Sequence, residues 1–535
     1  MIARSLAPIQ KEVLSSYRMI SDYADGNASS VVIVGAGPAG LTAAYELSKA
    51  GVPVTVLEKD TQVGGLAKTI LFKGWRLDLG PHRFFTKLAE VNRIWQEVLG
   101  EDAMMIKRLT RIYYRNRFFF YPLRPANAFL SLGPWLSLKA FVSFVRARLR
   151  PVPEEKTFED WVSNRFGRTL YTMFFKTYTE KVWGIPCAEI EAEWAAQRIK
   201  GLSLLEAVRN AFGFGQKGRV KSLVDEFSYP KKGTGMFYEK MQKAVEQKGS
   251  RLSFGREVTA LHHKGGRITR VVTRNAEGLE ETWPATDVIT SLPLTLLIQR
   301  LNPPPPPDIL EASRQLTFRS TILVYLVIQG ENLFPDNWIY VHAPEVQMGR
   351  ITNFRNWSPE MTVPGQTVLC VEYWCFPSDS FWNQSDADLQ AMAAHDLQTI
   401  HLFKPAPVLD GFCIKIPRTY PVYRMGYRRY LDPLVAYLKT FANLQPIGRF
   451  GAFKYNNQDH SILMGMLAAR NLLGESHDLW SVNSDSEYQE EIQPLPYGAV
   501  IEEVIMRDHV TAHPASAEAS GPTLPGPSTA NPNRR

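Results

Sequence analysis

The amino-acid sequence predicts an α/β fold, in which a parallel sheet is joined to a second region of helices and antiparallel strands. Three observations predict it. Residues 31–58 have the pattern of a strand, a glycine turn, a helix and a second strand. Residues 106–224 are rich in aromatic residues at helical spacing, and residues 317–330 and 366–375 alternate apolar and polar residues as strands do. The length of 535 residues corresponds to about two to four domains.

Composition excludes several classes of protein. With 45% hydrophobic and 21% charged residues, the chain as a whole is neither disordered nor fibrous. It has no apolar run of about 18 residues that could cross a membrane, and no apolar stretch near its start that would indicate a secretory signal. The net charge of +8 suits an anionic small-molecule substrate, and no nucleic-acid recognition motif accompanies it. Four scattered cysteines indicate neither a disulfide framework nor a metal site, so we expect a reduced, cytoplasmic enzyme: Cys187, Cys370, Cys375 and Cys413.

Smaller patterns place the other elements. Thr157 and Asp160 have the spacing of a helix cap, and Pro303–Pro307 is typical of a stiff loop. Residues 250–293 indicate a β-hairpin region, and residues 446–473 indicate a strand, a loop and a helix. From about residue 508 the composition of Pro, Ser, Ala and Thr predicts a disordered tail.

The stretch 129–150 is apolar and ends in basic residues. Such a helix can rest on a membrane surface. More often it is buried, with its charged end reaching to solvent, and we expect the buried arrangement here.

The strongest motif is a dinucleotide fingerprint in VVIVGAGPAG. Gly35 allows the tight turn after a buried strand, Gly37 lets the backbone approach a pyrophosphate, and Gly40 lets helix and strand pack closely. Pro38 suits the first helical turn, where its missing N–H costs nothing. Glu58 ends the second strand, where an acid binds ribose hydroxyls, so the sequence predicts a Rossmann-type nucleotide site.

A second glycine pair, Gly64–Gly65, follows in VGGLAKT. This pair resembles the FAD-dependent superfamily of amine oxidases and protoporphyrinogen oxidase, which also includes UDP-galactopyranose mutase. The resemblance implies FAD as the cofactor, in a Rossmann-type FAD-binding domain. It also implies a mixed helical and antiparallel-sheet substrate domain. By this resemblance the following residues hold FAD: Gly35, Ala36, Gly37, Ala39, Gly40, Glu58, Lys59, Gly64, Gly65, Leu66, Gly80, His82, Val258, Arg449, Asn457, Gln458, Asp459 and Ser461.

Five further blocks resemble UDP-galactopyranose mutase in particular: RLDLGPHRFFT, FFKTYTEKVWG, GRITNFRNW, RTYPVY and GRFGAFKYNNQDHSI. The resemblance implies that aromatic residues stack on a nucleotide base and that an arginine clamps a diphosphate. The implied substrate-binding residues are Phe174, Tyr178, Trp183, Arg350, Tyr420 and Tyr455, and the implied catalytic residues are His82, Arg350, Tyr420 and Tyr455. Glu372 and Tyr373 follow at about the family distance.

Two positions depart from the mutase pattern. A second diphosphate-clamping arginine of the mutase falls on Leu202, four residues after Arg198, and an aspartate of the mutase falls on Asn457. The residues expected around the flavin are kept, whereas one expected diphosphate contact is lost, so either another cation compensates or the affinity for a nucleotide diphosphate sugar is low. Candidates are Arg198, Lys200 and Arg424.

Two functions follow from the resemblance. The first is a mutase that converts a nucleotide-linked sugar between pyranose and furanose forms through an adduct at N5 of reduced flavin, with NAD(P)H as a candidate reductant. The second is an FAD-dependent oxidase or desaturase that transfers hydride to the flavin. The expected divisions are a polar lead-in at 1–29, FAD-binding parts at 30–105, 225–300 and 446–480, substrate parts at 106–224 and 301–445, and an extension at 481–535.

Overall fold

The fingerprint strand lies at the centre of a parallel sheet. In the computed structural model, which describes residues 30–121, 125–199 and 226–483, Val31–Val34 forms β1 and all four of its residues are buried. The strand order is β20-β13-β1-β2-β9, and every pairing is parallel. The other members are β2 (Val54–Leu57), β9 (Arg251–Ser253), β13 (Asp287–Thr290) and β20 (Leu444–Pro446). Three separate stretches of the chain therefore build this one sheet.

A second, larger sheet is mostly antiparallel and has the order β19-β15-β18-β17-β16-β6-β7. The expected strands at 317–330 and 366–375 are confirmed as β15 (Phe318–Gln329) and β18 (Gln366–Cys375). Both faces of β15 are covered, because Ile322, Val324 and Leu326 pack in one core and Leu323 and Tyr325 in another. The other members are β6 (Thr110–Tyr114), β7 (Arg117–Phe120), β16 (Trp338–Val341), β17 (Arg350–Asn353) and β19 (Val408–Pro421).

Three smaller sheets complete the strands. The expected hairpin region is confirmed in a sheet of order β12-β11-β10-β14, in which β10 and β11 pair antiparallel. Its strands are β10 (Glu257–Lys264), β11 (Arg267–Arg274), β12 (Glu280–Pro284) and β14 (Leu301–Asn302). The two-stranded pairs are β3 (Thr69–Phe72) with β4 (Trp75–Asp78), and β5 (Ala103–Lys107) with β8 (Glu226–Pro230).

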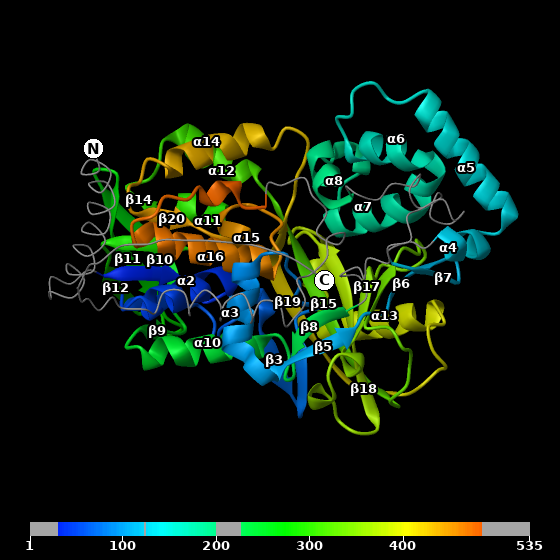
Figure 1. The fold of residues 1–535 in the computed structure, drawn as a ribbon, viewed down its shortest axis with the longest axis horizontal. Coiled ribbons are helices and arrows are strands. Elements are labelled where there is room, and N and C mark those ends of the chain that lie inside the picture. Colours follow the sequence, from blue (N-terminus) through cyan, green and yellow to red (C-terminus); the bar gives the residue numbers. More distant parts are fainter. Residues whose placement is uncertain (1–29, 122–124, 200–225, 484–535) are drawn as a thin grey trace, which may run out of the picture. The chain divides into compact units, whose positions relative to one another are not determined.

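Helices cover the parallel sheet and form a separate group beside the substrate region (Figure 1). Against the parallel sheet, α2 and α16 pack tightly on each other: a Cβ on Gly465 of α16 would lie 2.3 Å from the Ala39 oxygen of α2. The helices outside the separate group are, in chain order, α2 (Pro38–Lys49), α3 (Ala89–Leu99), α10 (Gly235–Gln247), α11 (Leu294–Gln299), α12 (Pro307–Gln315), α13 (Asp386–Thr399), α14 (Arg428–Leu438), α15 (Gly448–Gly451) and α16 (Gln458–Leu472).

The group beside the substrate region begins with a short helix and a long one, and it ends close to the site. Its members are α4 (Pro125–Leu132), α5 (Pro134–Leu149), α6 (Phe158–Leu170), a π-helical turn (Tyr171–Lys176), α7 (Thr177–Trp183) and α8 (Ala192–Ile199). The expected cap of α6 is confirmed, since the Thr157 hydroxyl accepts from the Asp160 N–H at 3.1 Å and Asp160 Oδ2 accepts from the Thr157 N–H at 3.1 Å.

The expectation for residues 129–150 was wrong. The stretch forms the end of α4 and all of α5, but of the α5 residues only Ala140 is buried. Leu130 is 77% exposed and Trp135 is 79% exposed, so the apolar side chains face solvent instead of a core. The expected disordered tail lies outside the described residues. No helix among the described residues is long and apolar enough to span a membrane.

Candidate active site

A cavity of about 820 Å³ connects the glycine turn of the parallel sheet with strands of the antiparallel sheet. One part is lined by the β1–α2 turn, the end of β2 and the start of α16. The other part, which we call the chamber, is lined by His82, Tyr178, Tyr340, His342, Arg350, Tyr420 and Tyr455. The sequence predicted five of these seven chamber residues.

The glycine turn has the geometry that the fingerprint predicts. Gly35 has a φ of +95°, and its N–H donates to the Leu57 carbonyl at 2.8 Å. A Cβ on Gly40 would lie 1.9 Å from the Gly35 oxygen, so helix and strand approach as closely as glycine allows. A Cβ on Gly65 would lie 3.1 Å from Gly37 Cα, which places the second glycine pair against the first turn. The two glycine motifs thus form one backbone cradle at the cavity wall.

Glu58 is fixed at the edge of this cradle. Its side chain is buried, and Oε2 accepts from the Ala36 N–H at 2.6 Å while Oε1 accepts from the Asp60 N–H at 2.9 Å. Each carboxylate oxygen retains a lone pair, and the residue lines the cavity. The arrangement therefore suits ribose hydroxyls, which donate hydrogen bonds to such a carboxylate.

Two helices direct their N-terminal ends at the same cavity. Gly37, Pro38 and Ala39, from the fingerprint, begin α2. Asn457–Ser461 begin α16, and of these all except His460 were implied by the family resemblance. The first-turn N–H groups of a helix have no partner within the helix and carry its positive dipole end. Two such helix ends at one cavity stabilise negative charge, such as that of a pyrophosphate or of an electron-rich ring.

Gln458 ties the start of α16 to the rest of the site. Its Oε1 accepts from the Tyr238 hydroxyl at 2.8 Å, and its Nε2 donates to the His82 carbonyl at 3.2 Å. His82 lies beside Arg350 and Arg449, and burial together with these two charges lowers its pKa to about 3. The imidazole is therefore neutral at pH 7.

The residues present fit FAD. The glycine cradle brings backbone N–H groups close to the cavity, with no room for a Cβ at Gly35 or Gly40, and Glu58 and the two helix ends complement the ribose and the phosphates. Lys59, Leu66, Val258 and Arg449 also line the cavity. Ala36, Gly40, Gly64 and Gly80 do not line it and lie behind the wall, where they hold its shape.

Arg350 and Glu372 form an ion pair at the centre of the chamber. They face each other across β17 and β18, with Arg350 Nε 2.6 Å from Glu372 Oε1 and a second nitrogen 2.5 Å from Oε2. Only 16% of the arginine side chain and 2% of the glutamate side chain are exposed. Burial alone would lower the pKa of the guanidinium, but Glu372 and the nearby tyrosines raise it well above its usual range.

Tyr420 and Tyr455 form a stack, and an arginine lies over both rings. Their ring centroids are 5.4 Å apart at 25°, and the Arg449 guanidinium lies 4.7 Å and 4.3 Å from the two ring centres. Arg449 also donates to the carbonyls of Thr419 and Asn456, each at 2.9 Å. Burial raises the pKa of Tyr420 to about 12, and the neighbouring Tyr455 adds to the shift.

Tyr178 extends into the chamber from α7. Its ring stacks on His342 at 4.7 Å and meets the edge of Tyr340 at 5.4 Å. Burial raises the pKa of Tyr178 well above its usual range, and burial together with Lys181 lowers that of His342 to about 3. The sequence analysis missed Tyr340 and His342, although the alternation in WIYVHA places Trp338, Tyr340 and His342 on one side of a strand.

The remaining predicted residues lie in other surroundings. Phe174 lines the cavity and packs on Phe119 with ring centroids 4.9 Å apart. Trp183 is only 2% exposed and does not line the cavity; it packs behind Tyr420 and Tyr455, at 6.0 Å and 5.9 Å. The Tyr373 hydroxyl donates to Asp396 at 3.1 Å, away from the chamber.

Arg424, one of the candidate compensating cations, does not line the chamber. Arg424 pairs with Glu189 at 2.9 Å and is 60% exposed. Lys200 and Leu202 lie outside the described residues, and the side chain of Arg198 is likewise not described.

Comparisons with known proteins agree with this geometry. Residues 38–424 match the model of the flavin containing amine oxidoreductase family. The L-amino-acid oxidase of Demansia vestigiata is 24% identical over 83% of this chain and 87% of its own length. L-amino acid oxidase Bs29 of Bothriechis schlegelii is 24% identical over 84% of this chain and 91% of its own length.

Two solved structures share the fold. A reduced UDP-galactopyranose mutase superposes with a TM-score of 0.74 at 21% identity, over 86% of this chain and 96% of its own. A putative protoporphyrinogen oxidase from Exiguobacterium sp. 255-15 superposes with a TM-score of 0.63 at 18% identity, over 84% of this chain and 99% of its own. The fold and site define a flavin-dependent enzyme. The chain belongs to the flavin containing amine oxidoreductase family, which confirms the predicted superfamily and fold class.

Proposed function

We propose that the protein is an FAD-dependent mutase that interconverts the pyranose and furanose forms of a nucleotide-linked sugar. One observation carries the proposal: the two chamber histidines and Tyr420 are poorly suited to transfer a proton near neutral pH. His82 and His342 have pKa values of about 3, that of Tyr420 is about 12, and Glu372 is held by Arg350. Efficient general acid–base chemistry needs a pKa near the working pH.

A ring contraction fits a chamber of this kind. Reduced flavin, when bound, supplies the nucleophile for such a reaction, and the protein contributes binding, orientation and electrostatics. The hydroxyls of Tyr178, Tyr420 and Tyr455 offer neutral hydrogen bonds to a polyhydroxylated substrate. Arg350 would hold a phosphate group with the guanidinium N–H groups that Glu372 does not occupy.

The closeness of the two stacked tyrosines argues against an amine held between aromatic rings. Tyr420 and Tyr455 have centroids 5.4 Å apart, and a guest between two rings needs about 7 Å, twice the usual contact distance. The Arg449 guanidinium already lies over both rings, so a cationic substrate would meet a like charge there. Both features favour a neutral or anionic substrate.

The second candidate is an FAD-dependent oxidoreductase. Its support is the pairing of Arg350 with Glu372. The glutamate neutralises the charge of Arg350 and occupies two of its nitrogens, which leaves less of the guanidinium for a substrate anion. The curated relatives named above are oxidases, which agrees with this alternative.

A substrate panel separates the two candidates. The purified protein would be incubated with nucleotide sugars, and separately with L-amino acids, with and without dithionite, and the products resolved by chromatography with mass detection. The mutase proposal expects an isomer of unchanged mass from one nucleotide sugar, formed only with dithionite. A keto acid, or any product lighter by two hydrogens and formed without dithionite, would refute it and support the oxidoreductase.

A further inference from the structure

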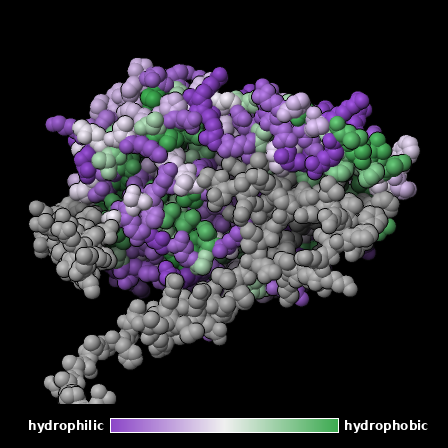
Figure 2. Space-filling model, turned by 45° about the horizontal axis from the view of Figure 1, so that its top comes forward, coloured by the Kyte–Doolittle hydropathy of each residue, from purple (hydrophilic) through white to green (hydrophobic). Residues whose placement is uncertain are grey.

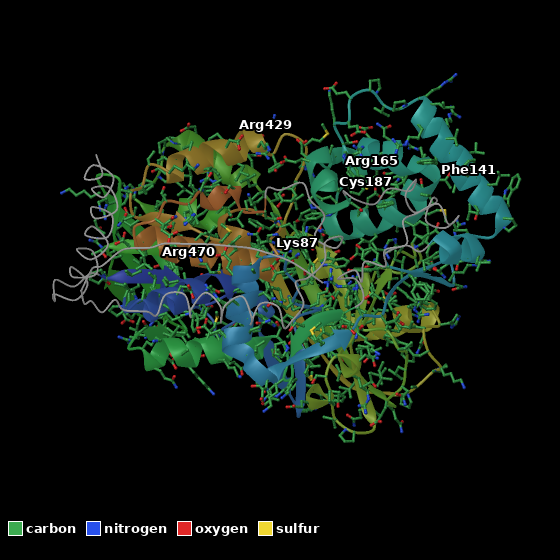
Figure 3. The ribbon with its side chains drawn as sticks, viewed as in Figure 1. Lys87, Phe141, Arg165, Cys187, Arg429 and Arg470 are labelled. Carbon is green, nitrogen blue, oxygen red and sulfur yellow. The ribbon has the colours of Figure 1, made fainter. Side chains whose placement is uncertain are left out.

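A patch of exposed apolar side chains covers the outer side of α4 and α5. It consists of Leu130, Trp135, Leu138, Phe141, Val142, Val145, Leu149 and Val152, which are eight of the fourteen exposed large hydrophobic residues in the described part of the chain. Figure 2 shows a continuous hydrophobic area at the α5 end of the molecule, and Phe141 is labelled on α5 in Figure 3. We call these residues the α5 patch. A monomeric soluble protein seldom gathers its exposed apolar residues in this way.

The apolar residues of α5 form one stripe with basic residues on both borders. At 3.6 residues per turn, the stripe from Trp135 to Leu149 spans an arc of about 120°. Lys139, Arg146 and Arg150 lie along one border and Arg148 along the other, and all four are exposed. Residues 103–153 contain ten lysines and arginines and no aspartate or glutamate, which concentrates more positive charge here than the formal +8 of the whole chain.

The opposite side of α5 fixes this orientation. Ala140 is buried there, and a Cβ on Gly167 of α6 would lie 2.6 Å from the Phe144 nitrogen, so the two helix backbones are in contact. The Ser143 hydroxyl accepts from the Thr169 N–H at 3.1 Å. Because small residues hold α5 against α6, the helix cannot rotate its apolar stripe inward without breaking this contact.

These features agree with a helix that lies in the plane of a membrane surface. With 16 residues, α5 is about 24 Å long, too short and too polar to span a bilayer. An interfacial helix has an apolar face, bordering lysines and arginines, and an aromatic residue at the head-group level. Trp135 stands in the first turn of α5, and the arginines stand in its last turn.

A second copy of the chain suits the patch poorly. Pairing two α5 stripes would bring four positive charges of each copy close to those of the other, and no carboxylate of residues 103–153 could offset them. An anionic lipid surface matches both the apolar stripe and the charge. We propose that the α5 patch docks the protein on anionic membranes, with the stripe at the acyl boundary and the basic borders among the head groups.

Co-sedimentation of the full-length, yellow protein with vesicles tests this proposal. Vesicles of phosphatidylcholine alone are compared with vesicles of equal parts phosphatidylcholine and phosphatidylglycerol. We expect the protein to pellet with the anionic vesicles, and to bind neutral ones at least about tenfold more weakly, since each basic residue near an anionic surface contributes to binding.

Two variants separate the parts of the patch. Phe141→Ser with Leu149→Ser removes the stripe, and should weaken binding to anionic vesicles by at least about a hundredfold. Arg146→Gln with Arg150→Gln should remove most of the preference for anionic lipid. The matched control is Leu71→Ser with Leu279→Ser, two leucines that are 71% and 68% exposed elsewhere, which should bind as the natural protein does. FAD absorbance of each variant reports that it has folded.

Several outcomes would overturn the proposal. The natural protein could stay in solution with anionic vesicles. The stripe variant could bind as well as the control, in which case charge alone attracts the protein. A dimer could form in solution that the stripe variant loses, without any vesicle binding, which would assign the patch to a second copy.

Discussion

Substituting Glu372 by glutamine tests whether the chamber is organised around a buried ion pair. Glu372 is 2% exposed and bonds Arg350 with two of its oxygens, at 2.6 and 2.5 Å. Removing one partner of a buried pair costs about 3–5 kcal/mol, because the other charge is left uncompensated. Glutamine keeps one accepting oxygen toward Arg350, so we expect the lower end, about 3 kcal/mol in the free energy of unfolding.

Urea denaturation followed by tryptophan fluorescence measures this loss. The matched control is Glu193→Gln, which breaks another two-pronged pair, with Arg428, whose partners are 54% and 41% exposed. An exposed pair contributes about 0–1 kcal/mol, so this control should move the midpoint little. Equal midpoints for the two variants would refute the view that burial makes the Arg350–Glu372 pair a structural centre of the chamber.

Four further outcomes are expected. Gly37→Val should yield colourless protein, because its side chain would fill the cradle against Gly65, and retained FAD absorbance would contradict this. Trp183→Ala should lower the free energy of unfolding by about 3–5 kcal/mol in urea titrations, since the residue is core and not cavity wall. His342 is buried and its pKa is lowered to about 3, so its stability contribution is complete above pH 6.5 and is lost as pH falls toward 3. Relative to His342→Gln, the natural protein should lose about 1 kcal/mol per pH unit in that window, and parallel pH profiles would contradict the assignment. Arg350→Lys should weaken substrate binding at least about tenfold in calorimetry, because lysine cannot present a fork of donors, and unchanged binding would remove Arg350 from the substrate site.

Local patterns predicted the nucleotide half of the site well. The glycine turn and the start of α16 each lie within a short stretch of sequence, and Glu58 lies at the end of the strand that follows the turn and helix. The chamber was harder to predict because it forms where α7, β16, β17 and β19 meet. Tyr340 and His342 enter it only through the order of strands in the larger sheet, which no local pattern determines.

Two differences from the sequence expectation have the same physical origin. The spacing of Trp183 within FFKTYTEKVWG suggested a substrate contact, but spacing along a helix does not distinguish a cavity wall from the layer behind it. The apolar stretch 129–150 suggested burial, but α6 offers α5 only a contact for small side chains at Gly167, and the large ones remain outside. In both cases tertiary packing decides which side of the helix faces the cavity, the core or the solvent.

The ratio of product formed to reducing equivalents consumed tests the central claim most directly. Protein whose flavin has been reduced once with a measured amount of dithionite would be held without oxygen, given the active nucleotide sugar, and assayed for product over time. The account predicts many product molecules per reducing equivalent, with the flavin still reduced at the end. One product molecule per flavin, or product formed only when oxygen is admitted and consumed in equal amount, would contradict it.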